Sequence, residues 1–264
     1  MSNSKTFSFK KNNRRAFTLI ELSIVLIIIG LLIVAITSGS SLIRNAKLRS
    51  ITNEAKQYQV AVNSFFMKFD KYPGDFDESL GGDSVQGTGD DIIQWHTSGD
   101  INEGSNTWLQ LIAAGILPTD IRSSMTTAEM MDATSRTLRP NTHFPPSAEN
   151  SAGWIFNSRP DNNVTINYVQ LVKSFTSQFE GGELDSPAID GTAGGSLTAT
   201  DAYSIDNKND DGVRNSGDIR EVFTITTGAG NDCDSADDVT ATNNYDLDNQ
   251  TADVCSLAFK VTIN

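Results

Sequence analysis

Oxygen-bearing side chains between residues 207 and 218 have the spacing of a calcium-binding loop. Such a loop spans twelve residues, with oxygen ligands at positions 1, 3, 5, 9 and 12, glycine at position 6 and a main-chain carbonyl at position 7. The matching residues are Asn207, Asn209, Asp211, Gly212, Val213, Asn215 and Asp218. The first position is Asn, and Asp218 is shorter than the usual Glu. The residues therefore predict a weak calcium site, with a solvated turn as the alternative.

Two cysteines, Cys233 and Cys255, are the next residues with evident chemistry. The 21 residues between them include six Asp and no Lys or Arg, so this segment is poor at building a core of its own. In an oxidising compartment a disulfide between them would stabilise the fold by roughly 3 kcal/mol. Two unpaired buried thiols are the alternative, and we expect the disulfide.

Catalysis has no support in the sequence. His96 and His143 lie in no metal-ligand spacing, and there is no G-x-S-x-G, H-E-x-x-H, phosphate-loop or C-x-x-C pattern. With 33 Asp and Glu residues, no pair can be assigned as acid and base. The aspartates from Asp83 to Asp91 match no template and predict a loop. We therefore do not expect an enzyme.

The charge of the chain is divided unevenly. The first sixteen residues hold five basic and no acidic residues, so the net charge of −13 leaves −18 for the remainder. Binding to nucleic acid depends on clustered Lys and Arg, and the acidic remainder argues against it. Such a remainder fits a solvated extracytoplasmic surface, or one that meets cations.

The segment from Phe17 to Ile36 predicts a membrane-spanning helix. It has twenty residues and one charge, Glu21, and as a helix it would be about 30 Å long. The basic residues before it predict a cytoplasmic N-terminus. A cleavable secretory signal would have a shorter apolar run and an A-x-A site. A plain signal anchor leaves Glu21 unexplained, because a carboxylate at membrane depth costs roughly 2.5 to 3.5 kcal/mol and usually has a partner.

The N-terminal residues RRAFTLIELSIVLIIIGLL resemble the signature of type IV pilins and of type II secretion pseudopilins. The resemblance implies that a prepilin peptidase removes residues 1–16 by cutting between Ala16 and Phe17. It also implies that the new Phe17 amine is methylated and that Glu21 pairs with this amine in a neighbouring subunit. The pairing would offset the cost of burying either charge. The family usually has Gly where this chain has Ala16, and we expect slower cleavage.

A seven-residue pattern extends the apolar run into one long helix. The seam consists of Leu48, Ile51, Ala55, Tyr58, Val62, Phe65 and Phe69, which step by three and four residues. The helix is predicted from 17 to 71, about 80 Å long, with a weak point at 37–41 and an end before Pro73. We expect its second half to pack on the protein's own head domain, and its first half to contact lipid or copies of itself.

The remaining residues, 72–264, predict a small head domain. Helices are expected at 106–117 and 126–132, strands at 164–175, 221–226 and 256–263, and loops at 141–163 and 180–195. Apolar and polar residues alternate in the last strand, as in a sheet with one solvent-exposed face. The expected fold is therefore α+β and pilin-like: a long N-terminal helix packed on a small antiparallel sheet.

Three head segments resemble pseudopilins more weakly. They are KYPGDF at 71–76, W-x-x-L-x-x-A-G at 108–115 and AYSIDNKNDDG at 202–212. The last resembles part of an extended loop that binds calcium in major pseudopilins, which implies ligands at Asp206, Asp210 and Asp211. Together with the loop spacing, the candidate calcium ligands are Asp206, Asn207, Asn209, Asp210, Asp211 and Asp218.

The resemblance implies a structural subunit of a type IV pilus-like filament, and the head segments favour a type II secretion pseudopilin. Such a subunit crosses the inner membrane once, keeps its head in the periplasm, and is extracted into a pseudopilus that drives protein export. Its implied partners are copies of itself, other pilin-like subunits, prepilin peptidase, and an inner-membrane assembly platform with its ATPase. The alternatives are a minor or tip pilin acting in adhesion or DNA uptake, where nucleic acid would be a partner, and a membrane-anchored exported enzyme.

Overall fold

The computed structural model describes residues 18–82, 84–93, 103–122, 137–138, 140–148, 152–161, 164–173, 175–176, 195–221, 233, 244–247 and 255–263. The chain forms two compact units, residues 1–46 and residues 47–264. Several predictions fall outside the described residues: the leader with its cleavage site, His96, the helix at 126–132, and the strand at 221–226 beyond its first residue.

Helix α1 (Leu19–Phe69) is one helix of 51 residues, as the heptad pattern predicted. It begins with a capping box, in which the Thr18 hydroxyl accepts the Glu21 N–H at 3.3 Å. In return, Glu21 Oε2 accepts the Thr18 N–H and hydroxyl, each at 2.8 Å. The helix continues through residues 37–41, so the expected weak point does not interrupt it. It ends at Asp70, whose left-handed φ of 56° stops the helix.

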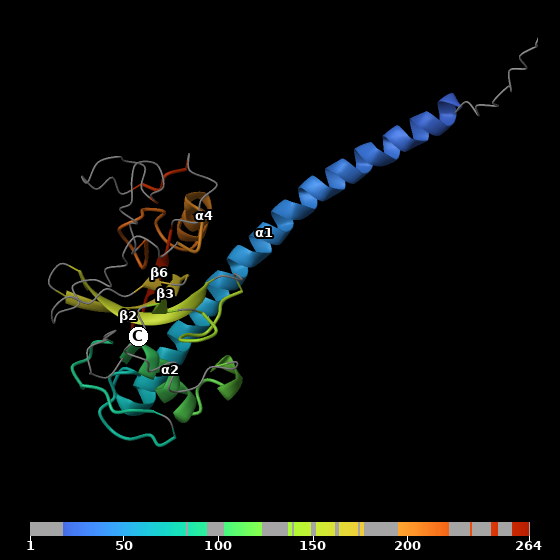
Figure 1. Cartoon of the computed structure of the whole chain (residues 1–264). Coiled ribbons are helices and arrows are strands. Elements are labelled where there is room, and N and C mark those ends of the chain that lie inside the picture. The colour runs from blue at the N-terminus through green and yellow to red at the C-terminus, as the bar shows by residue number, and fades with distance from the viewer. Residues whose placement is uncertain are drawn as a thin grey trace, which may run out of the picture. The chain divides into compact units, whose positions relative to one another are not determined.

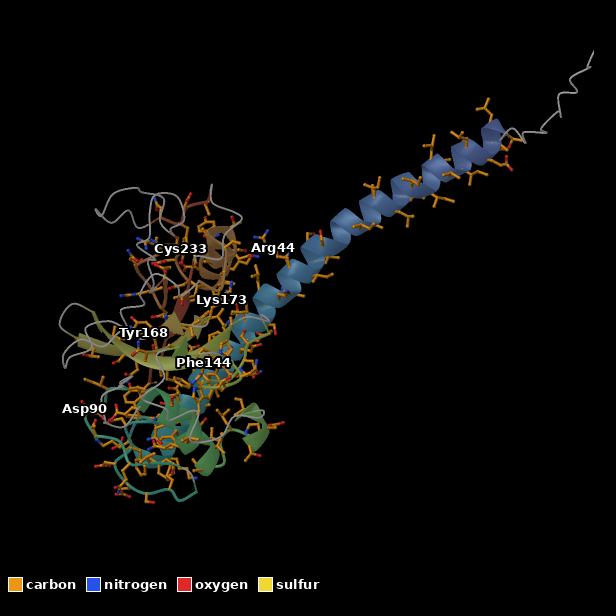
Figure 2. The ribbon with its side chains drawn as sticks, viewed as in Figure 1. Arg44, Asp90, Phe144, Tyr168, Lys173 and Cys233 are labelled. Atoms are coloured by element: carbon orange, nitrogen blue, oxygen red, sulfur yellow. A yellow bond between two sulfur atoms is a disulfide. The ribbon has the colours of Figure 1, made fainter. Side chains whose placement is uncertain are left out.

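In the first unit, α1 exposes a long apolar surface. The large apolar residues between 19 and 36 are 47–91% exposed, and Figure 2 shows side chains projecting from this part of the helix. Among the described residues, α1 is the one helix long and apolar enough to cross a membrane, with a mean hydropathy of 3.1 over 18 residues. By length and composition, α1 fits the predicted single-pass anchor.

The second half of α1 supplies one wall of the head-domain core. The seam residues from Leu48 to Phe65 are buried, and Phe69 is partly buried against the same core. Tyr58 packs edge-on against Trp108 and Trp154, with ring centroids 4.9 and 5.7 Å apart. These contacts confirm that this half of the helix packs on the protein's own head.

A four-stranded antiparallel sheet packs into the same core (Figure 1). Its strands are β2 (Gly153–Asp161), β3 (Val164–Val172), β5 (Ile219–Glu221) and β6 (Leu257–Lys260), in the order β2-β3-β6-β5. Strands β1 (Thr137–Leu138) and β4 (Phe175–Thr176) pair in a separate sheet. The strands expected at 164–175 and 256–263 are confirmed with shorter bounds, and the α+β class is confirmed with them.

Strand β2 corrects the prediction of a loop over 141–163. Its asparagine and Pro160 give it a loop-like composition, yet residues 153–161 pair with β3 along their whole length. Trp154 and Phe156 are fully buried, and burial of such large apolar side chains outweighs the weak strand propensity. Since β2 lies at an edge of the sheet, proline is tolerated there.

Helix α2 (Glu103–Ala113) confirms the helix expected at 106–117, with both ends shifted toward the N-terminus. Trp108 and Leu111 are fully buried in the core. Gly115 has a φ of 73° and lies just beyond the helix end, where left-handed backbone is common. A short 3-10 helix, η1 (Thr119–Arg122), follows.

Glu54 joins α1 to the edge of the sheet. Its Oε2 accepts the Trp154 indole N–H at 2.7 Å, and its Oε1 accepts the Ala148 N–H at 3.0 Å. Trp154 is fully buried, so its N–H needs an acceptor within the protein. The carboxylate therefore holds α1 at a fixed position along β2.

Glu54→Ala is expected to lower the free energy of unfolding by about 2 kcal/mol, because the buried Trp154 N–H loses its acceptor. The measurement is urea unfolding of the full-length protein in detergent micelles, followed by tryptophan fluorescence. Glu54→Gln retains a side-chain oxygen and should lose less. Equal stability of the alanine variant and the wild type would contradict this account.

Candidate functional site

The first candidate site is the start of α1. Both hydrogen bonds from Thr18 reach Oε2 of Glu21, so this carboxylate folds back over the first helical turn. Negative charge is favoured there by the unpaired N–H groups and the dipole of a helix N-terminus. Sequence reasoning missed Thr18, although Thr-x-x-Glu is a capping-box spacing. Ala16 and Phe17 lie outside the described residues, so their cleavage, methylation and pairing with Glu21 stay predictions.

The second candidate site is a group of three carboxylates at the end of helix α4 (Ala199–Asn209). Asp206 is in the last turn of the helix, Asp210 follows the helix directly, and Asp211 is the next residue. One oxygen of each lies within 4.8 Å of the others. We call this group the α4 carboxylate cluster.

Helix α4 corrects the expectation of an extended loop over 202–212. The Thr198 side chain caps it by accepting a main-chain N–H of the first turn at 3.2 Å. Ala202 and Ile205 are then buried in the core. Packing of this face stabilises a helix that an Asn- and Asp-rich composition disfavours. Residues 207–209, the start of the predicted twelve-residue loop, are therefore helical.

The loop after α4 is folded around the carboxylate of Asp210. Its Oδ2 accepts the N–H groups of Asp218 at 2.5 Å and Ile219 at 2.8 Å. Asp211 accepts a main-chain N–H within the same loop at 2.8 Å. Gly217 has a φ of 74°, and a Cβ there would lie 2.0 Å from Asp210 Oδ2. Another residue there would be strained by the positive φ and would displace the carboxylate, so glycine suits this turn.

Two of the predicted calcium ligands face lysines. Asn209 Oδ1 accepts a hydrogen bond from Lys56 Nζ at 3.4 Å, and Asp218 Oδ1 lies 3.7 Å from Lys260 Nζ. Asn207 is exposed on the last turn of α4. Of the six candidate ligands, the structure thus brings together the three aspartates that the family resemblance implied.

The donor set of the α4 carboxylate cluster fits a hard divalent cation. Calcium takes oxygen ligands at 2.3–2.6 Å, so oxygens sharing one ion lie up to about 5 Å apart, as these do. Burial raises the pKa of Asp206 to about 6, despite the hydrogen bonds that it accepts from Tyr245 and Gly212. The charges of Asp211 and Asp210 contribute to the rise. A bound cation would relieve both the burial cost and the repulsion.

Cys233 and Cys255 form the predicted disulfide, with Cα atoms 5.0 Å apart. Both are fully buried. Sequence reasoning missed Tyr245, which lies between them and donates its hydroxyl proton to Asp206 Oδ2 at 2.8 Å. No pattern in the sequence marks this contact, because it joins residues 39 apart. The segment bounded by the disulfide thus reaches the α4 carboxylate cluster.

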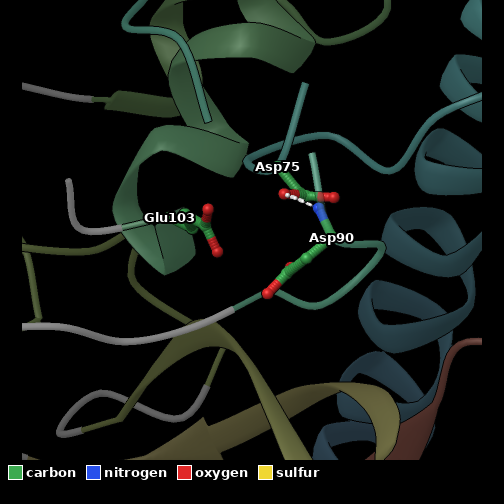
Figure 3. Close-up of side chains that lie close together, drawn as sticks. All are labelled: Asp75, Asp90 and Glu103. Atoms are coloured by element: carbon green, nitrogen blue, oxygen red, sulfur yellow. Dashed lines mark hydrogen bonds between the residues drawn. The ribbon is translucent and has the colours of Figure 1, made fainter. Parts of the chain in front are cut away.

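A second carboxylate cluster lies beside the start of α2, and sequence reasoning did not identify it (Figure 3). It joins Asp75, Asp90 and Glu103, with one oxygen of each within 4.8 Å of the others. The Asp75 carboxylate accepts the N–H groups of Gly89, Asp90 and Asp91 at 2.5, 3.1 and 2.6 Å. Burial raises the pKa of Asp75, and these hydrogen bonds oppose the rise. Asp75 therefore acts as the organising acceptor of this loop.

Glu103 attaches the same loop to α2. Its Oε1 accepts the Thr88 N–H at 2.9 Å and lies 2.8 Å from the Thr88 hydroxyl. That hydroxyl is also 3.1 Å from Asp75 Oδ1. A hydroxyl has one proton to donate, so the two buried carboxylates share it. These contacts explain the cluster as a structural joint between the loop and the helix.

Comparison with known protein families gives a match at the N-terminus. Residues 11–37 match the family model of the prokaryotic N-terminal methylation motif, and this segment includes the predicted cleavage position and Glu21. This match supports a type IV pilin-like protein, and the long apolar helix with the small antiparallel sheet gives the α+β layout expected of one. No curated protein and no solved structure matches the chain.

Asp75→Ala is expected to lower the free energy of unfolding by about 3 kcal/mol, because three main-chain donors lose their acceptor. Urea unfolding of the full-length protein in detergent measures the change. Glu78→Ala, at a nearby exposed carboxylate, is the matched control and should unfold like the wild type. If both variants unfold like the wild type, Asp75 does not organise the loop.

Proposed function

We propose that this protein is a structural subunit of a type II secretion pseudopilus, a periplasmic filament of the type IV pilus kind. The observation that carries the proposal is the continuity of α1. The methylation motif at 11–37 leads into a single helix whose second half is buried in the head domain. One element therefore connects the anchor to the head. The motif suggests a structural protein, and no catalytic role is proposed.

Processing of the N-terminus prepares the subunit for assembly. Prepilin peptidase cuts between Ala16 and Phe17, and the new amine is methylated. This amine then pairs with Glu21 of a neighbouring subunit, which offsets the cost of two charges at membrane depth. Thr18 already donates to Oε2 of the glutamate, and a carboxylate has acceptor capacity on its second oxygen for the amine.

Assembly takes place from the inner membrane. The apolar side chains of residues 19–36 need either lipid or other copies of this helix around them, because they are exposed in the single chain. The subunit is anchored by one pass with its head in the periplasm, and an assembly platform with its ATPase lifts it from the bilayer. Copies of itself and other pilin-like subunits form the rod, whose growth pushes exported proteins outward.

The preference for a pseudopilin over a surface pilin rests on the resemblance of the head segments. The segments 71–76 and 108–115, which both resemble pseudopilins, are hydrogen-bonded to each other. The Gln110 side chain accepts the Gly74 N–H at 2.6 Å and donates to the Phe76 carbonyl at 3.1 Å. The two segments therefore form one structural unit.

We propose calcium as the ligand of the α4 carboxylate cluster, held by Asp206, Asp210 and Asp211. Bound calcium would offset the negative charge of three neighbouring carboxylates. Asp206 belongs to α4, whereas the other two carboxylates follow it and accept hydrogen bonds from the loop. Their shared ligand would hold the loop to the helix.

Glu21→Ala is expected to leave N-terminal cleavage intact and to abolish protein export, because the Phe17 amine loses its partner in the bilayer. The N-terminal mass of the membrane-fraction protein is measured with and without active prepilin peptidase, and export is followed in the same cells. Ser23→Ala removes one hydroxyl from the same part of the helix and should export normally.

A wild-type chain that begins at methylated Phe17 supports the proposal. A chain that begins at Met1 with or without the peptidase contradicts it, as does normal export by the Glu21→Ala variant. Loss of adhesion or DNA uptake in a deletion strain with export intact would make the protein a surface pilin instead.

Calcium at millimolar concentration is expected to raise the melting temperature of the full-length protein in detergent and to release or absorb heat in titration calorimetry. Extracellular calcium sites bind at about 10⁻⁴ to 10⁻³ M. Asp206→Asn should abolish both responses. Asp218→Asn should respond like the wild type, because that carboxylate faces Lys260. A wild-type protein with neither response has no calcium site at α4.

A further inference from the structure

The hydroxyl of Tyr245 contacts the most buried member of the α4 carboxylate cluster. Tyr245 is 4% exposed, and its hydroxyl donates to Asp206 Oδ2 at 2.8 Å. The other oxygen of Asp206 accepts the Gly212 N–H at 3.2 Å. Each oxygen thus has one protein donor, and the two donors come from different segments. Together they fix the plane of the carboxylate.

The disulfide holds the segment that carries Tyr245. The N–H of Asp246, the next residue, donates to the Cys233 carbonyl at 2.9 Å. Cys233 is bonded to Cys255, which exchanges main-chain hydrogen bonds with Leu197 at 2.9 and 3.1 Å. Leu197 lies two residues before α4 begins.

These contacts close a ring around α4. One side of the ring is the helix itself, from its start near Leu197 to Asp206 in its last turn. The other side runs through the disulfide to Tyr245 and returns to the helix by the hydroxyl–carboxylate hydrogen bond. Through this ring, the Cys233–Cys255 disulfide restrains the orientation of the Asp206 carboxylate.

A tyrosine hydroxyl suits this position because it is a neutral donor. It fixes a carboxylate by one hydrogen bond and leaves the negative charge in place, whereas a lysine or arginine would neutralise that charge. The negative charge of the α4 carboxylate cluster therefore remains available to bind a cation. The aromatic ring also packs against Tyr203, with centroids 5.9 Å apart, so ring and hydroxyl have separate roles.

We propose that Tyr245 is a positioning residue for calcium at Asp206, Asp210 and Asp211, and that the Cys233–Cys255 disulfide tunes calcium affinity through it. The inference rests on the proposed calcium site. It extends that proposal by assigning the disulfide a role in ligand binding besides stability. Losing the hydroxyl and losing the disulfide should then have overlapping effects, because both act through the same hydrogen bond.

The test measures calcium affinity of the full-length protein in detergent, by titration calorimetry and by the calcium-dependent rise in melting temperature. The variants are Tyr245→Phe, the paired change Cys233→Ser with Cys255→Ser, and the combination of all three. Tyr245→Phe keeps the ring and removes the hydroxyl. Tyr203→Phe, at the neighbouring ring, is the matched control.

Tyr245→Phe is expected to weaken calcium binding about fivefold, as the loss of one positioning hydrogen bond would. The cysteine pair should weaken it by a similar factor, and the triple variant by little more than either alone. Tyr203→Phe should bind calcium like the wild type. The melting temperature of each variant in the presence of a chelator measures its effect on stability alone, separately from its effect on calcium binding.

Unchanged calcium affinity in Tyr245→Phe, with binding retained by the wild type, overturns the inference and leaves the proposed calcium site standing. A lower melting temperature in chelator with unchanged affinity overturns it too, since the hydroxyl would then serve structure alone. Independent, additive losses in the triple variant would separate the disulfide from Tyr245 and overturn the coupling. If the cysteine variants do not fold, Tyr245→Phe alone decides. A wild type that binds no calcium removes both the site and the inference.

Discussion

The rest of the structure depends on one constraint: a single helix, α1, must be stable both in a bilayer and against the core of the head domain. A helix pairs its own N–H and C=O groups, so the same element is stable where its side chains meet a bilayer and where they meet a protein core. Between residues 19 and 36, large apolar side chains are exposed along the helix. From Leu48 to Phe65, the buried apolar side chains form only the seam that includes Tyr58. Helix α2 and strand β2 place Trp108 and Trp154 against that seam. Glu54 then secures the contact by accepting the Trp154 indole N–H.

Periodicity and covalent chemistry made part of this fold predictable from the sequence. The seam, the alternation in β6 and the cysteine pair each reflect a local rule, and each is found in the structure. Strand β2 and helix α4 were not predicted because local composition disfavours both and tertiary packing of their apolar residues decides their conformation. The hydrogen bonds of Asp75 and Tyr245 could not be predicted either, because each joins residues that are distant in the sequence.

Two acidic side chains order loops of the head domain by accepting main-chain hydrogen bonds. Asp75 and Asp210 each collect main-chain N–H groups from a loop, and the loop is ordered without strands of its own. Glu221 instead pairs with Arg214 at 3.0 Å in the core, where the charges neutralise each other. The strong negative charge of the chain is therefore partly structural, because some of its carboxylates serve as acceptors inside the head.

The capping box at the start of α1 bears on how a filament of such subunits would be taken apart. Glu21 has hydrogen bonds within its own chain before it meets another subunit. A contact with a neighbour would therefore add to, or exchange with, hydrogen bonds that already exist. In a subunit that leaves the filament, the glutamate would keep its hydrogen bonds to Thr18. The first turn of a released helix would therefore need no rearrangement before the helix enters a bilayer again.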